Sequence, residues 1–184
     1  MSFLELARRR QSVRSYLPLQ VERAKIERCL EAARLAPSAS NDQPWHFVVA
    51  DEPALVRELG KAGYNRFTRA VPAFVAVVCE PGQAVARLGG WLAGRDYRLI
   101  DLGMAAEHFC LQAAEEGLGT CMLGLFNQRQ VRRLLRVPPG RRVQILITLG
   151  YPADAQIRQK RRKDLGRVRS YNRYGAANSG LHRS

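Results

Sequence analysis

The chain has 184 residues, of which 46% are hydrophobic and 25% charged, and these values are ordinary for one globular domain covering residues 1–184. They exclude disorder over the whole chain, and no apolar run approaches the roughly 20 residues of a membrane span. The formal net charge of +14 indicates an anionic partner, such as nucleic acid, an acidic surface or a phosphorylated ligand, with a solvated basic surface as the alternative.

The elements predicted for the first half are three helices, of which the one over 22–35 is amphipathic, and two strands. In chain order they are a short helix over 2–9, a helix over 22–35, a polar loop over 38–44, a strand over 45–50, a helix over 52–61 and a strand over 72–79. Pro37 ends the second helix. The continuous apolar run of residues 72–79 predicts a strand covered on both faces.

The second half begins with residues 81–98, which contain several glycines and are predicted to be irregular, as part of a lid. Asp101 is predicted to cap the helix that follows. The remaining elements are a helix over 102–116 ended by glycines, a strand over 120–125, a helix over 127–135 capped by Asn127, a strand over 142–149 and a basic tail over 158–173. One central sheet with helices, in an α+β or mixed α/β arrangement, is therefore expected.

The cysteines and histidines show no pattern of a metal site. Each cysteine lies in an apolar segment without a C-x-x-C pair, which predicts reduced core residues: Cys29, Cys79, Cys110 and Cys121. The histidines lack zinc-like spacing. Because the N-terminus also lacks the apolar core of a signal peptide, we predict a cytoplasmic protein without a metal.

Basic residues near both ends are candidates for phosphate binding. Arg10, Ser12 and Arg14 alternate, so an extended segment would point two guanidiniums and a hydroxyl to one side. The run Lys160–Lys163 can close over a phosphate or bind nucleic acid. In both cases a solvated charged stretch is the alternative.

Two uncharged segments are candidates for contact with a flat ring. Residues 37–45 place short polar side chains between a helix and a strand, where backbone N–H groups and amides match the edge of a heteroaromatic ring; an ordinary loop is the alternative. Glycines in residues 117–124 allow close approach of the backbone, although Gly117 and Gly119 also suit a helix end. This segment is not a G-x-G-x-x-G fingerprint, because it follows a helix instead of opening one.

Motifs of side-chain nucleophiles are missing. The chain has no paired-carboxylate motif, no G-x-S-x-G elbow and no Walker loop. A redox cofactor would remove the need for such groups, because the cofactor carries the chemistry. We therefore predict no catalytic side chain.

In order and spacing, the segments together resemble the nitroreductase family of FMN-dependent enzymes. The matching text is RQSVRSY, EAARLAPSASNDQPWHFVV, VPAFVAVV, IDLGMAAEHFCLQAAEEGLGTCMLGLFN, ILITLGYP and KRRKDLGRVRSYNRYG. The resemblance implies an α+β fold with a mostly antiparallel central sheet between helices. It also implies an intertwined homodimer in which the basic segment 158–175 reaches the partner subunit.

The resemblance also implies a set of FMN-binding residues. Arg10, Gln11 and Ser12 match the segment that holds the phosphate and ribityl chain, and Arg14 matches the cation near N1 and O2 of the ring. The remaining positions match the loop given by the second subunit, the backbone at the ring edge and the tail cations: Pro37, Ser38, Ala39, Ser40, Asn41 and Gln43; Leu123, Gly124 and Leu125; Lys160 and Arg162.

The activity implied by the resemblance is the transfer of a hydride from NADH or NADPH, through flavin N5, to an electron-poor small molecule such as a nitroaromatic or a quinone. One alternative keeps the fold but changes the reaction, for example to reductive dehalogenation. The other is a basic nucleic-acid-binding module, against which stand the scattered arginines and the lack of a recognised reader motif.

Overall fold

One antiparallel sheet organises the chain in the computed structural model, which describes residues 1–154 and 156–175 apart from the side chains of residues 85–88. The sheet has four strands in the order β1-β2-β4-β3. The strands are β1 (Trp45–Ala50), β2 (Ala73–Cys79), β3 (Gly119–Leu123) and β4 (Arg142–Gly150). This arrangement confirms the predicted α+β fold with a central antiparallel sheet.

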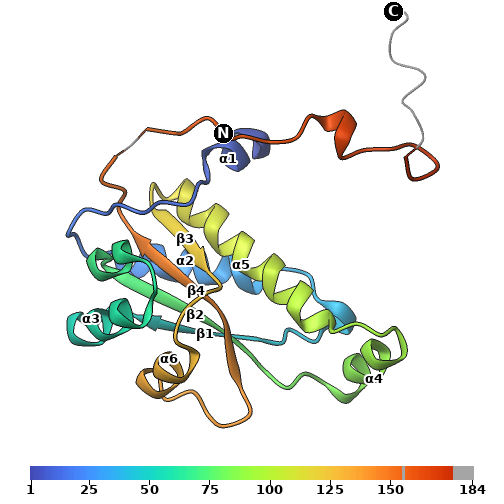
Figure 1. The fold of residues 1–184 in the computed structure, drawn as a ribbon, viewed down its shortest axis with the longest axis horizontal. Helices are drawn as coiled ribbons and strands as arrows, with labels where there is room; N and C mark the ends of the chain where they lie inside the picture. Colours follow the sequence, from blue (N-terminus) through green and yellow to red (C-terminus); the bar gives the residue numbers. More distant parts are fainter. Residues whose placement is uncertain (155, 176–184) are drawn as a thin grey trace, which may run out of the picture.

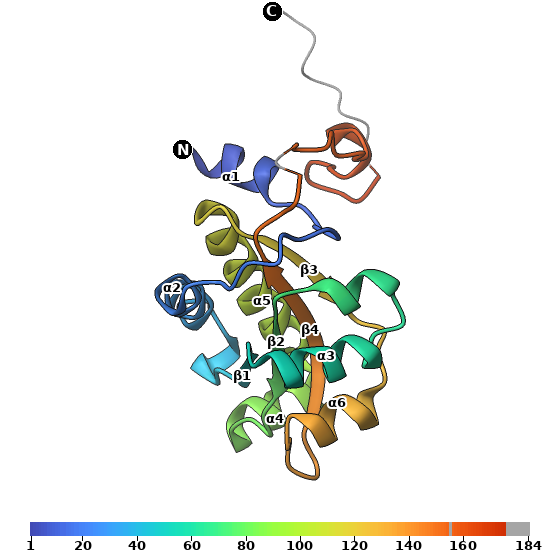
Figure 2. The same cartoon turned by 90° about the vertical axis from the view of Figure 1, so that its left-hand side faces the viewer.

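Helices cover both faces of the sheet (Figures 1 and 2). The α-helices are α1 (Phe3–Arg9), α2 (Arg23–Arg34), α3 (Pro53–Ala62), α4 (Ala84–Leu92), α5 (Tyr97–Glu115) and α6 (Gln128–Leu134). Short 3-10 turns are η1 (Ala39–Asn41), η2 (Arg66–Ala70) and η3 (Leu165–Arg167). Helices α2 and α5 pack on one face of the sheet, and α3 and α6 pack on the other.

Strand β2 lies inside this sandwich, and every one of its residues is buried. Val75 and Val77 face the core formed with α2 and α5, whereas Phe74 and Ala76 face the core formed with α3 and α6. The alternation of side chains along a strand explains this division. The predicted strand with two covered faces is therefore confirmed.

Two predictions for residues 81–101 were wrong. The segment predicted to be irregular contains α4, and α5 begins at Tyr97, before the predicted start. The cap of α5 is Asp96, whose side chain accepts a hydrogen bond from Arg98 N at 3.2 Å, and Asp101 lies within the helix. A Cβ on Gly90 would lie 2.6 Å from Arg95 O, so this glycine lets the turn after α4 fold back on the helix.

The segment after α1 runs along the free edge of β3 (Figure 1). Ser12 forms an isolated parallel bridge with Thr120, and Val13 N donates a 2.8 Å hydrogen bond to Thr120 O. The Tyr16 hydroxyl lies 2.6 Å from Thr148 Oγ1. These contacts tie the start of the chain to the edge of the sheet. None of the helices in the described part of the chain has the length and apolar character needed to cross a membrane.

Candidate functional site

Cations from both ends of the chain gather beside the middle of α5. Arg10 Nε lies 3.1 Å from Glu107 Oε1, and Lys160 Nζ donates a hydrogen bond to Ala7 O. Burial lowers the pKa of Lys160, and the positive charges of Arg10 and Arg162 lower it further, while Glu107 opposes them. The structure therefore brings together three of the predicted phosphate-binding side chains.

The Arg10 side chain has unused hydrogen-bonding capacity. Its Nε is buried and makes no hydrogen bond within the described part of the chain, because the close approach to Glu107 lacks hydrogen-bond alignment. A buried guanidinium N–H without an acceptor is costly. An anion with several oxygens, such as a phosphate, would satisfy this donor and offset the repulsion between the neighbouring cations.

A second group of predicted residues lies next to these cations. Gln11 Oε1 accepts a 3.2 Å hydrogen bond from Arg158 N, and Arg158 Nη2 donates to Ser12 O at 2.6 Å. Burial raises the pKa of the Cys121 thiol, whereas the nearby charge of Arg14 lowers it, so Arg14 lies close to β3. Gln11 and Ser12 therefore contact the tail through Arg158, whereas Arg14 is placed only by its proximity to β3.

Arg158 belongs to this group of residues but was not among those predicted from the sequence. The signal was present, because Arg158, Lys160 and Arg162 alternate, as Arg10, Ser12 and Arg14 do. In an extended tail this spacing puts all three side chains on one side. Glu107 was not predicted either, because its role depends on a contact between α5 and a distant part of the chain.

The residues predicted at the ring edge follow the other end of β3. Leu123 is buried as the last residue of the strand, whereas Leu125 is 71% exposed. A Cβ placed on Gly124 would meet no atom within 4 Å, so the backbone here is open on that side. Strand β3 thus links the cation cluster near its start to an open backbone at its end.

The loop predicted to come from the second subunit comprises residues 37–43 and is called the 37–43 loop. Within one chain it lies apart from the residues described above. It packs against the first turns of α5, where Ala39 N donates a 3.2 Å hydrogen bond to Asp101 Oδ2, whereas Arg10 contacts the C-terminal half of that helix (Figure 1). Three of its residues, Ser40, Asn41 and Gln43, have φ values of 53°, 55° and 50°. Positive φ values are uncommon for non-glycine residues, so three of them within four positions mark this loop as an unusual stretch of backbone.

Comparison with known proteins shows to which family the chain belongs. The model of the nitroreductase family matches residues 7–151, which is most of the chain. The chain belongs to the nitroreductase family. Members of this family are NAD(P)H-dependent flavin oxidoreductases, so the prediction of an enzyme of this class is confirmed.

Individual relatives agree with this assignment. A candidate NADH dehydrogenase/NAD(P)H nitroreductase of Archaeoglobus fulgidus is 30% identical over 156 residues, covering 82% of this chain and 86% of the relative. A 5,6-dimethylbenzimidazole synthase of Rhodobacter capsulatus is 28% identical, with 80% and 82% covered. The crystal structure of a nitroreductase family protein from Clostridium difficile 630 superposes with a TM-score of 0.79 at 27% identity, covering 94% of this chain and 99% of that one.

Asp101 has a structural role that differs from the helix cap predicted from the sequence. Its side chain is 3% exposed and accepts a hydrogen bond from the loop rather than from its own helix. Burial raises the pKa of its carboxyl, the Ala39 N–H lowers it, and the charges of Asp42 and Asp96 raise it. Asp101 therefore fixes the 37–43 loop to α5.

We expect Asp101→Ala to lower the free energy of unfolding by about 1–3 kcal/mol, because it leaves the Ala39 N–H without its acceptor. Asp101→Asn keeps an oxygen at the same place and should cost much less. Urea unfolding of both variants measures the difference. Equal losses for the two substitutions would show that the hydrogen bond to the loop is unimportant.

Proposed function

We propose that this chain is an FMN-dependent oxidoreductase that moves a hydride from NADH or NADPH to an electron-poor small molecule, such as a nitroaromatic or a quinone, and that it works as a homodimer. One observation carries the proposal. Lys160 and Arg162 lie close to Arg10, and the buried Arg10 Nε has no hydrogen-bond acceptor within the described part of the chain. A flavin phosphate is an anion of the required kind.

The flavin phosphate would lie among cations from two distant parts of the chain. Arg10, Lys160 and Arg162 would hold it from both ends of the chain, while Glu107 keeps Arg10 in place. The Ser12 side chain is partly exposed beside them and would add a hydroxyl donor. Charged donors of this kind form short hydrogen bonds to phosphate oxygens, which supports the assignment of the tail and the N-terminal segment to one anion.

The free edge of β3 would hold the edge of the flavin ring. Because Thr120 O accepts from Val13 N, the backbone groups of Thr120 point away from β4. Backbone groups alternate in direction along a strand, so those of Met122 point to the same free edge, and Gly124 follows directly after the strand ends. An N–H of this edge and the open side of Gly124 suit the edge of a flat heteroaromatic ring.

Exposed apolar side chains on α1 and α5 favour a second subunit. Helix α1 has no buried residue, and its Phe3 and Leu4 are 70% and 65% exposed. Leu99 and Ile100 likewise expose about half of their surfaces on α5. Apolar side chains gathered on exposed helices are typical of a surface that a partner covers. A homodimer would cover them and bring the 37–43 loop of one chain to the ring held by the other.

Bound FMN would supply the hydride chemistry, so this chain needs no nucleophile of its own. Its residues bind and orient the cofactor, and Arg14 would place a fixed positive charge where negative charge develops on the reduced ring. Such preorganised charge is an effective way to stabilise a developing anion. The acceptor would approach the same ring after the nicotinamide leaves.

The absorbance spectrum of the purified protein, recorded with added FMN, tests the proposal. We expect a yellow protein with about one FMN per chain, which NADH or NADPH bleaches under anaerobic conditions. A panel of nitroaromatic, quinone and halogenated acceptors then separates nitroreduction from dehalogenation. A colourless monomer that does not take up FMN would reject the proposal, and salt-sensitive binding of nucleic acid by such a protein would favour the alternative.

We expect Arg14→Ala to weaken FMN binding or to slow reduction of the flavin by roughly tenfold, because an exposed charge–charge interaction is worth about 1 kcal/mol or slightly more. Stopped-flow reduction by NADH and NADPH, together with an FMN titration, measures both effects. Unchanged affinity together with unchanged reduction kinetics would remove Arg14 from the site.

A further inference from the structure

A cavity of about 430 Å³ lies between the 37–43 loop, α4 and the first turns of α5. It is separate from the cation cluster, because the Arg10 and Lys160 side chains do not line it. A volume of this size accommodates a substituted single aromatic ring. The cavity is therefore a candidate for a small-molecule site that the cofactor residues do not use.

Aromatic side chains form part of its wall. Trp91, near the end of α4, is 78% exposed, and Tyr97 begins α5. Gly90 also lines the cavity, and its missing side chain leaves room between the two aromatic residues and the turn after α4. An exposed tryptophan beside a cavity offers an uncovered face for stacking and for a cation.

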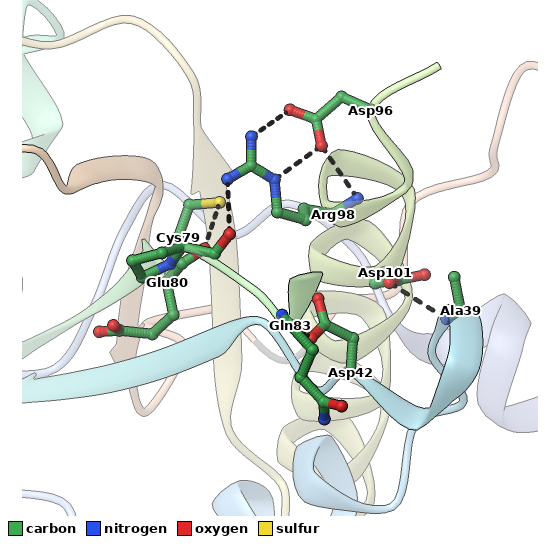
Figure 3. Close-up of polar contacts among 9 residues, drawn as sticks. Ala39, Asp42, Cys79, Glu80, Gln83, Asp96, Arg98 and Asp101 are labelled. Atoms are coloured by element: carbon green, nitrogen blue, oxygen red, sulfur yellow. Dashed lines mark hydrogen bonds and ion pairs between the residues drawn. The ribbon is translucent and has the colours of Figure 1, made fainter. Parts of the chain in front are cut away.

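The charged lining is unusual for this protein. Whereas the chain carries a net charge of +14, the described lining has three carboxylates, Asp42, Asp96 and Asp101, against two guanidiniums, Arg95 and Arg98. Asp96 is paired with Arg98 through hydrogen bonds of 2.8 Å to both of its oxygens (Figure 3). Once this pair is set aside, the charged lining consists of two carboxylates, Asp42 and Asp101, and one exposed guanidinium, that of Arg95.

Asp42 and Asp101 are both held in place by backbone N–H groups, as Figure 3 shows. Asp42 Oδ1 accepts a 2.5 Å hydrogen bond from Gln83 N, and Asp101 Oδ2 accepts one of 3.2 Å from Ala39 N. Asp101 is nine-tenths buried or more, and the charge of Asp42 raises the pKa of its carboxyl. Two fixed carboxylates that repel each other at the wall of a cavity stabilise a cation placed between or beside them.

We propose that this cavity binds an aromatic compound that carries a protonated amine, with its ring against Trp91 and Tyr97 and its ammonium group toward Asp42 and Asp101. The inference rests on the proposed function in one respect: the compound is the electron acceptor. Ala39 and Asp42, which line the cavity, belong to the loop that would wall the partner subunit's flavin. An acceptor held here would therefore lie beside the ring in the assembled dimer.

The test compares three acceptors with the same nitroaromatic ring and different charges: 4-nitrobenzylamine, 4-nitrobenzyl alcohol and 4-nitrobenzoate. Each is titrated at neutral pH into the protein as purified, and binding is followed by calorimetry and by quenching of tryptophan fluorescence. We expect the amine to bind about tenfold more tightly than the alcohol, and the benzoate more weakly than both, as one partly screened ion pair with a cation–π contact predicts. The same order is expected in kcat/KM with NADH or NADPH.

Asp42→Asn is the decisive variant, because it removes the charge and keeps an oxygen for the Gln83 N–H. We expect it to reduce the advantage of the amine about fivefold, with no change in binding of the alcohol. Asp51→Asn is the matched control: it makes the same change of charge at a surface residue that pairs with Arg23, away from the cavity. This control should leave all three affinities unaltered.

Trp91→Ala separates stacking from charge. It should weaken binding of all three compounds, that of the amine most, and abolish most of the fluorescence quenching. Equal affinities for the three compounds, or an equal effect of Asp42→Asn and Asp51→Asn, would overturn the inference.

The two proposals fail in different ways. A yellow protein that NAD(P)H reduces, but that shows no preference for the amine, would overturn the inference and leave the proposed function intact. A colourless protein that does not take up FMN, but binds the amine with the expected preference, would reject the proposed function and uphold the cavity as a site for aromatic amines.

Discussion

Arg10→Ala is expected to lower the affinity for FMN about a hundredfold, since two charge-assisted hydrogen bonds to phosphate contribute about 3 kcal/mol in total. The substitution removes the buried Nε donor that has no acceptor within the described part of the chain. It also leaves Glu107, half-buried on α5, facing the site without its positive partner. That carboxylate would then repel the phosphate, which adds to the loss.

Titration of the protein with FMN, followed by flavin fluorescence, measures this loss. Arg8→Ala is the control, because Arg8 is an exposed basic residue of α1 two residues before Arg10. Arg10→Ala/Glu107→Gln should recover part of the affinity. A variant with Arg10→Ala that binds FMN as tightly as the unchanged protein would place the phosphate elsewhere, and would separate the cation cluster from the cofactor.

Lys160 and Arg10 are expected to act on the same anion, and a double-mutant cycle can show this. Each side chain affects the other, since the charge of Arg10 lowers the pKa of Lys160. When both contact one phosphate, the loss of affinity in the double variant differs from the sum of the two single losses. Additive losses would instead indicate two independent anion sites.

Local patterns indicated which extended segments carry candidate site residues. Alternation of Arg10, Ser12 and Arg14 predicts a shared side, which stays a prediction; the structure places Ser12 beside β3 and the tail, and Arg10 beside Glu107 of α5. The partner of Arg10 was not predictable in this way. Glu107 is far from Arg10 in sequence, and helical spacing does not indicate which residue of another segment lies opposite.

The fold shows the same limit. The uninterrupted apolar run of β2 predicted its burial on both faces, because few other arrangements hide such a run from water. The order β1-β2-β4-β3 was not predictable, since periodicity does not determine which strands are neighbours. Glycine lowers helix propensity, so α4 was missed, although Gly94, with φ of 62°, is the kind of residue that ends a helix.

Asp101 illustrates why a single residue type can mislead. An aspartate near the start of an apolar helical pattern is a good candidate for a cap, and Asp96 fulfils that role five residues earlier. Asp101 instead accepts a hydrogen bond from a loop in a different part of the sequence. The residue type indicated an acceptor for a backbone N–H, but only the tertiary structure shows whose N–H it is.

Gly119→Ala is expected to lower the free energy of unfolding by about 1–3 kcal/mol and to weaken FMN binding about tenfold. A Cβ at this position would lie 2.7 Å from Val13 Cγ2 and 2.8 Å from Val13 Cβ. Val13 cannot move aside alone, because its N–H is bonded to Thr120 O. The added methyl group would therefore displace the segment that carries Ser12 and Arg14.

Gly117 provides a matched control from the same glycine-rich stretch. Its φ is 77°, and a Cβ there would meet nothing within 4 Å, so Gly117→Ala costs about 1 kcal/mol through backbone conformation and not through contact. Urea unfolding and FMN titration of both variants are then repeated with Val13→Ala added.

The second substitution should restore part of the FMN binding in Gly119→Ala, because it removes the Cγ atoms at 2.7 and 2.9 Å and leaves only Cβ, at 2.8 Å, to shift. It should do nothing for Gly117→Ala. The two glycines were indistinguishable as helix-ending residues in the sequence, and only one of them sets how closely the start of the chain approaches β3. If Val13→Ala rescued neither variant, the distance between these two segments would not control the geometry of the site.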